Sequence, residues 1–289
     1  MSPLFLNRRD ALRLMMAGAV TAAPRVSLAN DRGHAAGDPD LTDPEQLLLA
    51  FMRLGASLDD RLVIWWMDGV RYGVVDAQAE ALFGMKVGMF HRFFRQLDGD
   101  YKLAMFELTY YTDLASGALL EEFANPYTGE TNRVAHVRLG PEIRRQTSRG
   151  LADPGNTMVH DYRSSLGPAM INGDLLWIPT SVHATIKFPK PTAPEILLNI
   201  YTTVQGRLSE AVDPGLQSAP ATLAFQNVLK WEPFMRMGDR PGHMMSRAAG
   251  RKLQSVDELP ADYLACAERM HPQLIEDPIA TLAPLTDNF

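Results

Sequence analysis

Residues 86–111 read KVGMFHRFFRQLDGDYKLAMFELTYY, two strongly apolar runs on either side of one turn. The runs at 86–97 and 101–111 are rich in aromatic and large apolar residues, as half-buried β-strands are. Asp98-Gly99 between them is a turn signal, because Gly adopts the positive φ of a tight turn without steric cost. The stretch therefore predicts a long antiparallel β-hairpin.

The same pattern continues on both sides of this hairpin. Upstream, apolar runs at 62–67 and 70–75 flank Asp68-Gly69, which predicts another hairpin with its turn at that pair. Downstream, we expect a turn at 112–117 before a strand at 118–123, a turn at 125–130 before a strand at 131–137, and strands at 157–162, 175–188, 196–208 and 222–231.

An all-β fold follows from this order of strands. About ten antiparallel strands without alternating helices argue against a doubly wound α/β fold. Such a meander buries its edges by closing into a barrel or folding into a sandwich, and we expect a barrel. Two helices should flank it: one capped by Asp43 and begun by Pro44, and one within 255–270.

The first 29 residues have the order of a secretory leader. Arg8-Arg9 lie in a basic region, a weakly apolar stretch follows at 14–23, and Ser27-Leu28-Ala29 supplies small residues for cleavage. Adjacent arginines mark the twin-arginine type. We therefore expect recognition by the twin-arginine export machinery, cleavage near Ala29, a periplasmic location and no membrane anchor after processing. The alternative is an ordinary amphipathic N-terminal helix.

The leader and the rest of the chain divide the sequence into three parts. After residues 1–29, Gly, Asp, Ala and Pro in mixed order predict a disordered tether at 30–42. The remainder, 43–289, is expected to be a single barrel domain with an N-terminal and a C-terminal helix.

Charge and cysteine content limit the partners and the chemistry. The whole chain carries −6, and removal of a leader that carries four Arg and one Asp leaves −9. An acidic chain lacks the basic footprint that nucleic acid or anionic lipid requires. Cys266 is the single cysteine, so no intrachain disulfide can form; we expect it to be a small buried side chain on a helix.

The side chains of three predicted strands alternate between two faces, and the composition of one face predicts a ligand cavity inside the barrel. In each strand one face mixes large aromatic side chains with an amide or an imidazole, as small-molecule pockets do. The alternative is a solid core whose polar side chains satisfy backbone groups. The cavity walls we expect are Trp177 with His183, Asn199 with Tyr201, and Asn227 with Trp231, together with Trp66 from the first strand.

Glu107 and His183 are the candidates for proton transfer. Burial in an apolar pocket moves the pKa of a carboxyl or an imidazole toward working pH. Glu107 lies mid-strand among apolar neighbours, where it faces either solvent or the interior. Tyr110 and Tyr111 point to opposite faces, so one looks inward, and we expect Tyr111 to hold a developing oxyanion.

Two loops supply further polar candidates. Residues 231–243 combine aromatic residues, two Met, an Arg-Pro-Gly turn and His243, and we expect this loop to lie over the barrel mouth. Arg240 could clamp a carboxylate or phenolate, or pair with Asp239. Asn125 could bind an oxyanion, or form a turn through its side chain.

Nucleotide, flavin and metal chemistry find little support in the sequence. It holds no Gly-x-Gly-x-x-Gly, Walker or Gly-x-Ser-x-Gly pattern. The seven histidines show no short metal-ligand spacing, although a site across strands from His136, His160 and His183 stays open. We expect neither a cofactor nor a metal.

Residues 47–278 contain several short motifs, each present once. They are Tyr111-Thr112-Asp113 with Gly117, Asn125-Pro126-Tyr127-Thr128-Gly129-Glu130, Trp231-Glu232-Pro233-Phe234, Met237-Gly238-Asp239-Arg240-Pro241-Gly242, Gly250-Arg251-Lys252-Leu253 and Glu258-Leu259-Pro260. In these the chain resembles a bacterial family, domain of unknown function 1838. The resemblance implies an all-β barrel of the calycin or lipocalin-like kind and a twin-arginine leader. It implies no catalytic residues.

We therefore expect a cofactor-independent periplasmic lyase, isomerase or dehydratase that acts on a hydrophobic or aromatic small molecule by general acid–base chemistry. The first alternative is a non-catalytic binding or carrier protein for the same kind of molecule. The second is a structural barrel that binds a partner through an exposed apolar patch.

Overall fold

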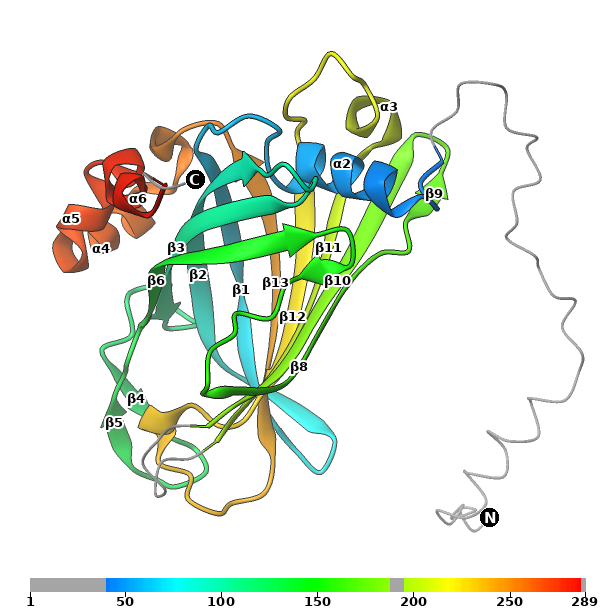
Figure 1. The fold of residues 1–289 in the computed structure, drawn as a ribbon. Helices are drawn as coiled ribbons and strands as arrows, with labels where there is room; N and C mark the ends of the chain where they lie inside the picture. The colour runs from blue at the N-terminus through cyan, green and yellow to red at the C-terminus, as the bar shows by residue number, and fades with distance from the viewer. Residues whose placement is uncertain (1–39, 188–194, 287–289) are drawn as a thin grey trace, which may run out of the picture. The chain divides into compact units, whose positions relative to one another are not determined.

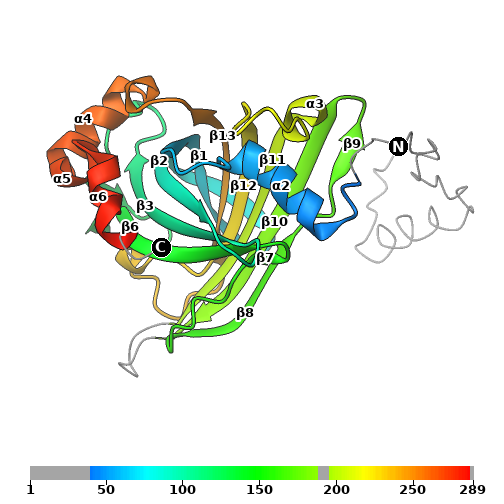
Figure 2. The same ribbon diagram turned by 45° about the horizontal axis from the view of Figure 1, so that its top comes forward.

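An antiparallel sheet that curls into a nearly closed barrel of ten strands forms the frame of the molecule (Figures 1 and 2). The computed structural model describes residues 40–187 and 195–286. The expected leader at 1–29 and residues 30–39 of the expected tether lie outside the described residues. The strand order around the barrel is β7-β6-β3-β2-β1-β13-β12-β11-β10-β8, with β9 paired to β10.

The elements have the following bounds. The barrel strands are β1 (Val63–Val75), β2 (Gln78–Arg95), β3 (Tyr101–Thr112), β6 (Val137–Thr147), β7 (Gly150–Leu151), β8 (Val159–Leu166), β9 (Met170–Asn172), β10 (Leu175–Ile186), β11 (Ile196–Arg207), β12 (Thr222–Leu229) and β13 (His243–Leu253). A separate hairpin consists of β4 (Glu122–Ala124) and β5 (Thr131–Arg133). The helices are α2 (Pro44–Gly55), α3 (Leu208–Ala211), α4 (Ala261–Met270), α5 (Pro272–Ile275) and α6 (Pro278–Thr286), with short 3-10 turns η1 (Pro233–Met235) and η2 (Val256–Glu258).

The barrel closes where β7 meets β8. The Tyr162 hydroxyl and Ser164 Oγ both donate to the carbonyl oxygen of Leu151, at 2.9 and 2.6 Å. At Gly150 an added Cβ would come within 2.7 Å of Ser164 Oγ, so the two strands approach too closely for a larger residue. Side-chain hydrogen bonds thus join the two ends of the sheet.

The predicted hairpin at 86–111 is confirmed. Arg95 on β2 pairs with Tyr101 on β3, and the turn between them holds Gly99 at φ +89°. The hairpin at 125–130 is also confirmed, since Ala124 pairs with Thr131. The all-β barrel with flanking helices is therefore the observed fold class.

The predicted turn at Asp68-Gly69 is wrong. Strand β1 runs through this pair, and the turn comes at Asp76 and Ala77, with φ of +49° and +63°. A Cβ on Gly69 would lie 2.3 Å from the carbonyl oxygen of Arg247 and 2.5 Å from Cβ of Ala248. Glycine is needed here because β13 approaches closely, and not because the chain turns.

The sequence did not predict the long strands β6 and β13, or the short strands β7 and β9. The inward positions of β13 include the small residues Ser246, Ala248 and Gly250, which give no apolar alternation. The corresponding positions of β6 include Glu142 and Arg144, so this strand has a polar inner face.

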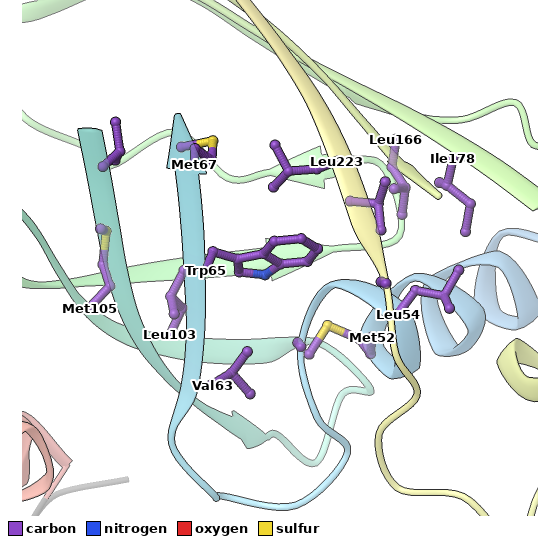
Figure 3. Packing of buried hydrophobic residues seen from close by; sticks show 14 of the residues in the cluster. Met52, Leu54, Val63, Trp65, Met67, Leu103, Met105, Leu166, Ile178 and Leu223 are labelled. Carbon is purple, nitrogen blue, oxygen red and sulfur yellow. The ribbon is translucent and has the colours of Figure 1, made fainter. Parts of the chain in front are cut away.

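Helix α2 closes one end of the barrel. It begins as predicted, with the Asp43 carboxylate accepting from the backbone N–H of Glu45 at 2.9 Å. Its buried residues Met52 and Leu54 pack among inward-facing side chains of several strands (Figure 3). Trp65 Nε1 donates to the carbonyl oxygen of Gly55 at 2.8 Å, which fastens the end of the helix to β1.

Lys252 provides a second attachment of α2. Its Nζ lies in the interior and donates to the carbonyl oxygens of Arg53 and Ala56, at 2.8 and 3.0 Å, and to Ser218 Oγ at 2.8 Å. One ammonium group therefore connects β13 to the helix and to the loop after α3.

The C-terminal helices cover the outside of β1, β2 and β3. Tyr263 of α4 packs edge-on against Trp66, with ring centroids 4.9 Å apart, and its hydroxyl donates to the carbonyl oxygen of Leu108 at 3.0 Å. Phe90 and Phe106 stack beneath these helices, 4.5 Å apart. Both faces of β2 and β3 are buried as a result, which explains why residues 86–111 are apolar without strict alternation.

We expect Ala77→Gly to raise the free energy of unfolding by about 1 kcal/mol, because it removes the strain of a side chain in left-handed backbone. Gly69→Ala should lower the same quantity by more than about 2 kcal/mol, because its Cβ has no room against β13. Urea unfolding of both variants measures the two effects. If Gly69→Ala were neutral, the close approach of β1 and β13 would be contradicted.

We expect Lys252→Met to lower the free energy of unfolding by about 1–3 kcal/mol, because three acceptors lose the Lys252 amine as a donor. Lys230→Met, at an exposed position beyond β12, is the matched control and should change the stability little. Urea unfolding followed by Trp fluorescence measures both. Equal stability of the two variants would show that Lys252 does not hold α2 in place.

Candidate functional site

The strand register decides which side chains face the barrel interior. Ile178, Val204 and Leu223 occupy paired positions on β10, β11 and β12, and all three belong to the interior core. Figure 3 shows Ile178 and Leu223 near α2. Directly opposite residues of antiparallel strands point to the same face, and successive residues alternate. Every second residue counted from these three therefore points inward.

Four predicted wall and catalytic residues lie on the outer surface instead. Trp177, His183, Asn199 and Tyr201 occupy the alternate positions of β10 and β11, so they point away from the interior, contrary to the prediction. His183 Nδ1 and Asn199 Oδ1 share a hydrogen bond of 2.8 Å, and the His183 ring lies 5.4 Å from that of Tyr201. The alternation was right, but the face that mixes aromatic with polar side chains, which was expected to line the cavity, is the outer face of both strands.

Trp66 is another predicted wall that faces outward. It packs against Tyr263 of α4, as described above, and serves to hold the C-terminal helices on the sheet. His243 pairs with Val74 at the start of β13 and also occupies an outward position, since its neighbour Met244 belongs to the interior core.

The predicted loop residues gather away from α2, at the end of the barrel near β4 and β5 (Figure 1). Asn125 Nδ2 donates to the carbonyl oxygen of Met235 at 2.7 Å, and its Oδ1 accepts from the backbone N–H of Tyr127 at 2.9 Å. Its side chain thus builds the turn and ties it to η1, which is the alternative that the sequence left open and not an oxyanion site.

Trp231 and Arg240 belong to the same loop cluster. The Trp231 ring lies 5.2 Å from that of Tyr127, and its Nε1 donates to the carbonyl oxygen of Arg240 at 3.2 Å. The Arg240 residue is exposed, and its Nη1 reaches the carbonyl oxygen of Met237 at 3.5 Å. These contacts stabilise the loop, and they leave the guanidinium outside the barrel interior.

Glu107 does face the interior. It pairs with Met89 on one side and Leu139 on the other, and its carboxylate accepts the Thr109 hydroxyl at 2.9 Å. Burial raises the pKa of Glu107 above its ordinary value, and the positive charges of Arg144 and Arg71 oppose that rise. The carboxyl therefore holds a proton to higher pH than an exposed glutamate does.

Tyr111, also inward, joins a buried triad with Arg71 and Glu232. Arg71 Nη2 donates to the Tyr111 hydroxyl at 3.1 Å, and that hydroxyl donates to Glu232 Oε1 at 3.0 Å. Arg71 Nη2 also lies 3.4 Å from Glu232 Oε1, and its guanidinium carbon lies 5.4 Å from the centre of the Tyr111 ring. Burial raises the pKa of Tyr111, so the hydroxyl stays protonated and remains a donor.

A further set of inward polar side chains consists of His91 on β2 and of Glu142 and Arg144 on β6. Burial, helped by the charge of Arg144, lowers the pKa of His91 to about 3, so this inward imidazole is neutral near pH 7. Arg144 Nε bonds Glu142 Oε1 at 2.5 Å. Glu107 lies between this group and the triad, because Arg144, Arg71 and Glu142 all influence its pKa.

The sequence prediction therefore placed Glu107, Tyr111 and Asn227 among the site residues, and all three face inward. It missed Arg71, because the false turn at Asp68-Gly69 broke β1 just before it. It missed Ser246 with the whole of β13. Glu232 had a signal in the sequence, since it lies in the Trp-Glu-Pro-Phe motif at 231–234.

Neither a metal cluster nor a membrane helix is found in the described part of the chain. Within residues 40–187 and 195–286, no three His, Cys, Asp or Glu side chains gather where they could hold a metal ion. In the same residues no helix has the length and apolar character to cross a membrane.

We expect Glu107→Gln to change the pH dependence of stability. A raised pKa means that the folded protein binds this proton more tightly than the unfolded chain, so stability is lost as pH rises above the ordinary value of 4.5. Gln cannot ionise, so the variant should gain stability relative to the wild type between pH 4.5 and 8. Urea unfolding across this range measures the difference. Glu268→Gln, at an exposed position of α4, should follow the wild type, and the same behaviour in Glu107→Gln would contradict the raised pKa.

Comparison with known proteins identifies one family. Residues 59–283 match the family described as a protein of unknown function (DUF1838), and this range includes every strand of the barrel. No curated protein matches the chain, and no solved structure matches it.

Proposed function

The chain belongs to the DUF1838 family, and we propose that it is a cofactor-independent enzyme that moves a proton on a hydrophobic or aromatic small molecule, as a lyase, isomerase or dehydratase does. The observation that carries the proposal is the position of Glu107. A carboxyl with a raised pKa faces the barrel interior, on the same inner face as Tyr111 and within the electrostatic influence of the buried Arg71.

The chemistry proposed for Glu107 is general acid–base catalysis. An acid whose pKa lies closer to neutrality is a stronger base when ionised and still returns its proton easily. Removal of a proton from carbon next to a carbonyl places negative charge on the oxygen. Arg71 supplies N–H donors for that oxyanion, and a low-dielectric interior strengthens such interactions. The Tyr111 hydroxyl, held between Arg71 and Glu232, keeps the guanidinium oriented.

Apolar side chains supply the walls in this proposal. Val182, Ile200 and Phe225 point inward from β10, β11 and β12 yet remain partly exposed, so solvent reaches the interior between them. They replace the outward Trp177 and Tyr201 of the sequence prediction. Several titratable groups beside such walls favour an enzyme over a carrier, which needs only a polar group to orient its ligand.

We propose the periplasm as the site of this activity. The support is the leader-like order of residues 1–29, with Arg8-Arg9 and the small residues before Ala29. The twin-arginine export machinery and the small molecule are the partners that this proposal implies.

Proton exchange tests the proposed function. The mature protein is incubated in D₂O with a panel of hydrophobic ketones, such as 2-tetralone and β-ionone, and loss of the proton next to the carbonyl is followed by NMR. We expect exchange of at least one ketone, slowed at least tenfold in Glu107→Gln with binding retained. Glu268→Gln should exchange like the wild type.

Two outcomes would contradict this proposal. Unchanged exchange in Glu107→Gln would remove this residue from the mechanism. Binding without exchange for every ketone would favour the carrier alternative.

A further inference from the structure

A row of three polar side chains crosses neighbouring strands inside the barrel. Arg71 on β1 lies directly opposite Ser246 on β13, and Ser246 lies opposite Asn227 on β12. All three point inward. Gly250, four residues after Ser246 on β13 and so on the same face, lies between the core residues Met67 and Leu223. Arg71 and Asn227 are each 5% exposed and Ser246 is 0% exposed. We call these residues the polar row.

The polar row holds several atoms that have no hydrogen-bond partner. They are Nε and Nη1 of Arg71, Oγ of Ser246 and Oδ1 of Asn227. Each is buried and makes no hydrogen bond to another described residue. Buried polar atoms are paired in the great majority of proteins, so several unpaired ones side by side indicate a place prepared for another molecule.

The positive charge of Arg71 is only partly neutralised. A single nitrogen, Nη2, makes its contacts with Tyr111 and Glu232. The Glu232 oxygen near it lies 3.4 Å away and accepts the Tyr111 hydroxyl at 3.0 Å. The other two nitrogens of the guanidinium therefore keep N–H donors that point to no acceptor.

We propose that the polar row recognises a carboxylate on the substrate of the enzyme proposed above, on which this inference rests. The carboxylate accepts from one free nitrogen of Arg71 and from the Ser246 hydroxyl, and the other free nitrogen of Arg71 stays available for the oxyanion. Rotation of the Asn227 amide by half a turn presents its NH₂ group to the same place, because the two ends of an amide are nearly equal in size. The substrate is then an apolar molecule with one acidic end.

A carboxylate fits these donors better than a neutral carbonyl does. Hydrogen bonds between a guanidinium and a carboxylate are charge-assisted and roughly twice as strong as neutral ones. The buried position of Arg71 also reduces screening by salt, in contrast to the exposed Arg240 that the sequence suggested for this role.

The experiment compares two probes that differ only at the polar end, 2-naphthoate and 2-naphthalenemethanol. Each is titrated into the mature protein at pH 7.5 by calorimetry. We expect the acid to bind at least tenfold more tightly than the alcohol. Arg71→Gln should lose this preference because its affinity for the acid falls at least tenfold, and Ser246→Ala should weaken the acid more than the alcohol. Arg247→Gln, the exposed neighbour on β13, is the matched control and should behave as the wild type.

The failure of this inference differs from the failure of the proposed function. Equal binding of acid and alcohol by the wild type, or an acid preference that survives in Arg71→Gln, overturns the carboxylate site and leaves the proton-transfer proposal standing. Binding of neither probe also overturns the carboxylate site, and the ketone exchange experiment then decides the proton-transfer proposal separately.

A second measurement covers the case in which Arg71→Gln does not fold. Arginine Nε–H signals of the wild type are followed by two-dimensional NMR during each titration. Naphthoate should move the Arg71 signal and the alcohol should not. The absence of an acid-specific shift overturns the inference.

Discussion

The register of β1 with its two neighbours is the constraint on which the barrel interior depends. Strand β1 pairs with β2 and with β13 along almost its whole length. A slip of one residue would turn every side chain of β1 to the other face. Trp65 would then leave the end of α2, and Arg71 would leave Tyr111. Gly69 fixes the register, because only a residue without a side chain fits against Ala248 at that level.

Strands β1, β2 and β3 are buried on both faces, and the two faces differ in what they carry. The outer face of β1, β2 and β3 packs against α4 through Trp66, Phe106 and Tyr263. These contacts stabilise the sheet from outside. The inner face is thereby freed from supplying all of the core, and it carries polar groups such as Glu107 and Tyr111 in addition to apolar ones.

Elements of the fold could be predicted where a short sequence motif, such as a turn pair or a helix cap, has a purely local cause. Asp98-Gly99 is a turn because the chain reverses there, and Asp43-Pro44 begins a helix because a cap and a proline both fit its first turn. Gly69 shows the limit of such reasoning. Its sequence context matches a turn, but its cause is the approach of Ala248, a residue far along the chain that no local pattern reveals.

The site was harder to predict than the fold, because it depends on which face of each strand looks inward. Tyr110 and Tyr111 were correctly expected to face opposite ways, and Tyr111 is the inward one. The assignment failed for His183 because the inner face of β10 carries Thr180 beside Ile178, so neither face is distinctly polar. Arg71 and Ser246 become neighbours only through the pairing of β1 with β13, and β13 gave no signal of its own.

The apolar core beneath α2 and the unpaired polar side chains of Arg71 and Asn227 lie at different levels of the barrel, and this arrangement bears on how a ligand would lie. Near α2, the apolar side chains Met52, Leu54 and Trp65 fill much of the interior (Figure 3). Toward the other end, Arg71 and Asn227 are buried but not fully paired. Charges in a low-dielectric interior interact more strongly than on a surface. In the proposed site, an apolar molecule with one acidic end would therefore place that end at Arg71 and its apolar body along the strands that carry Glu107.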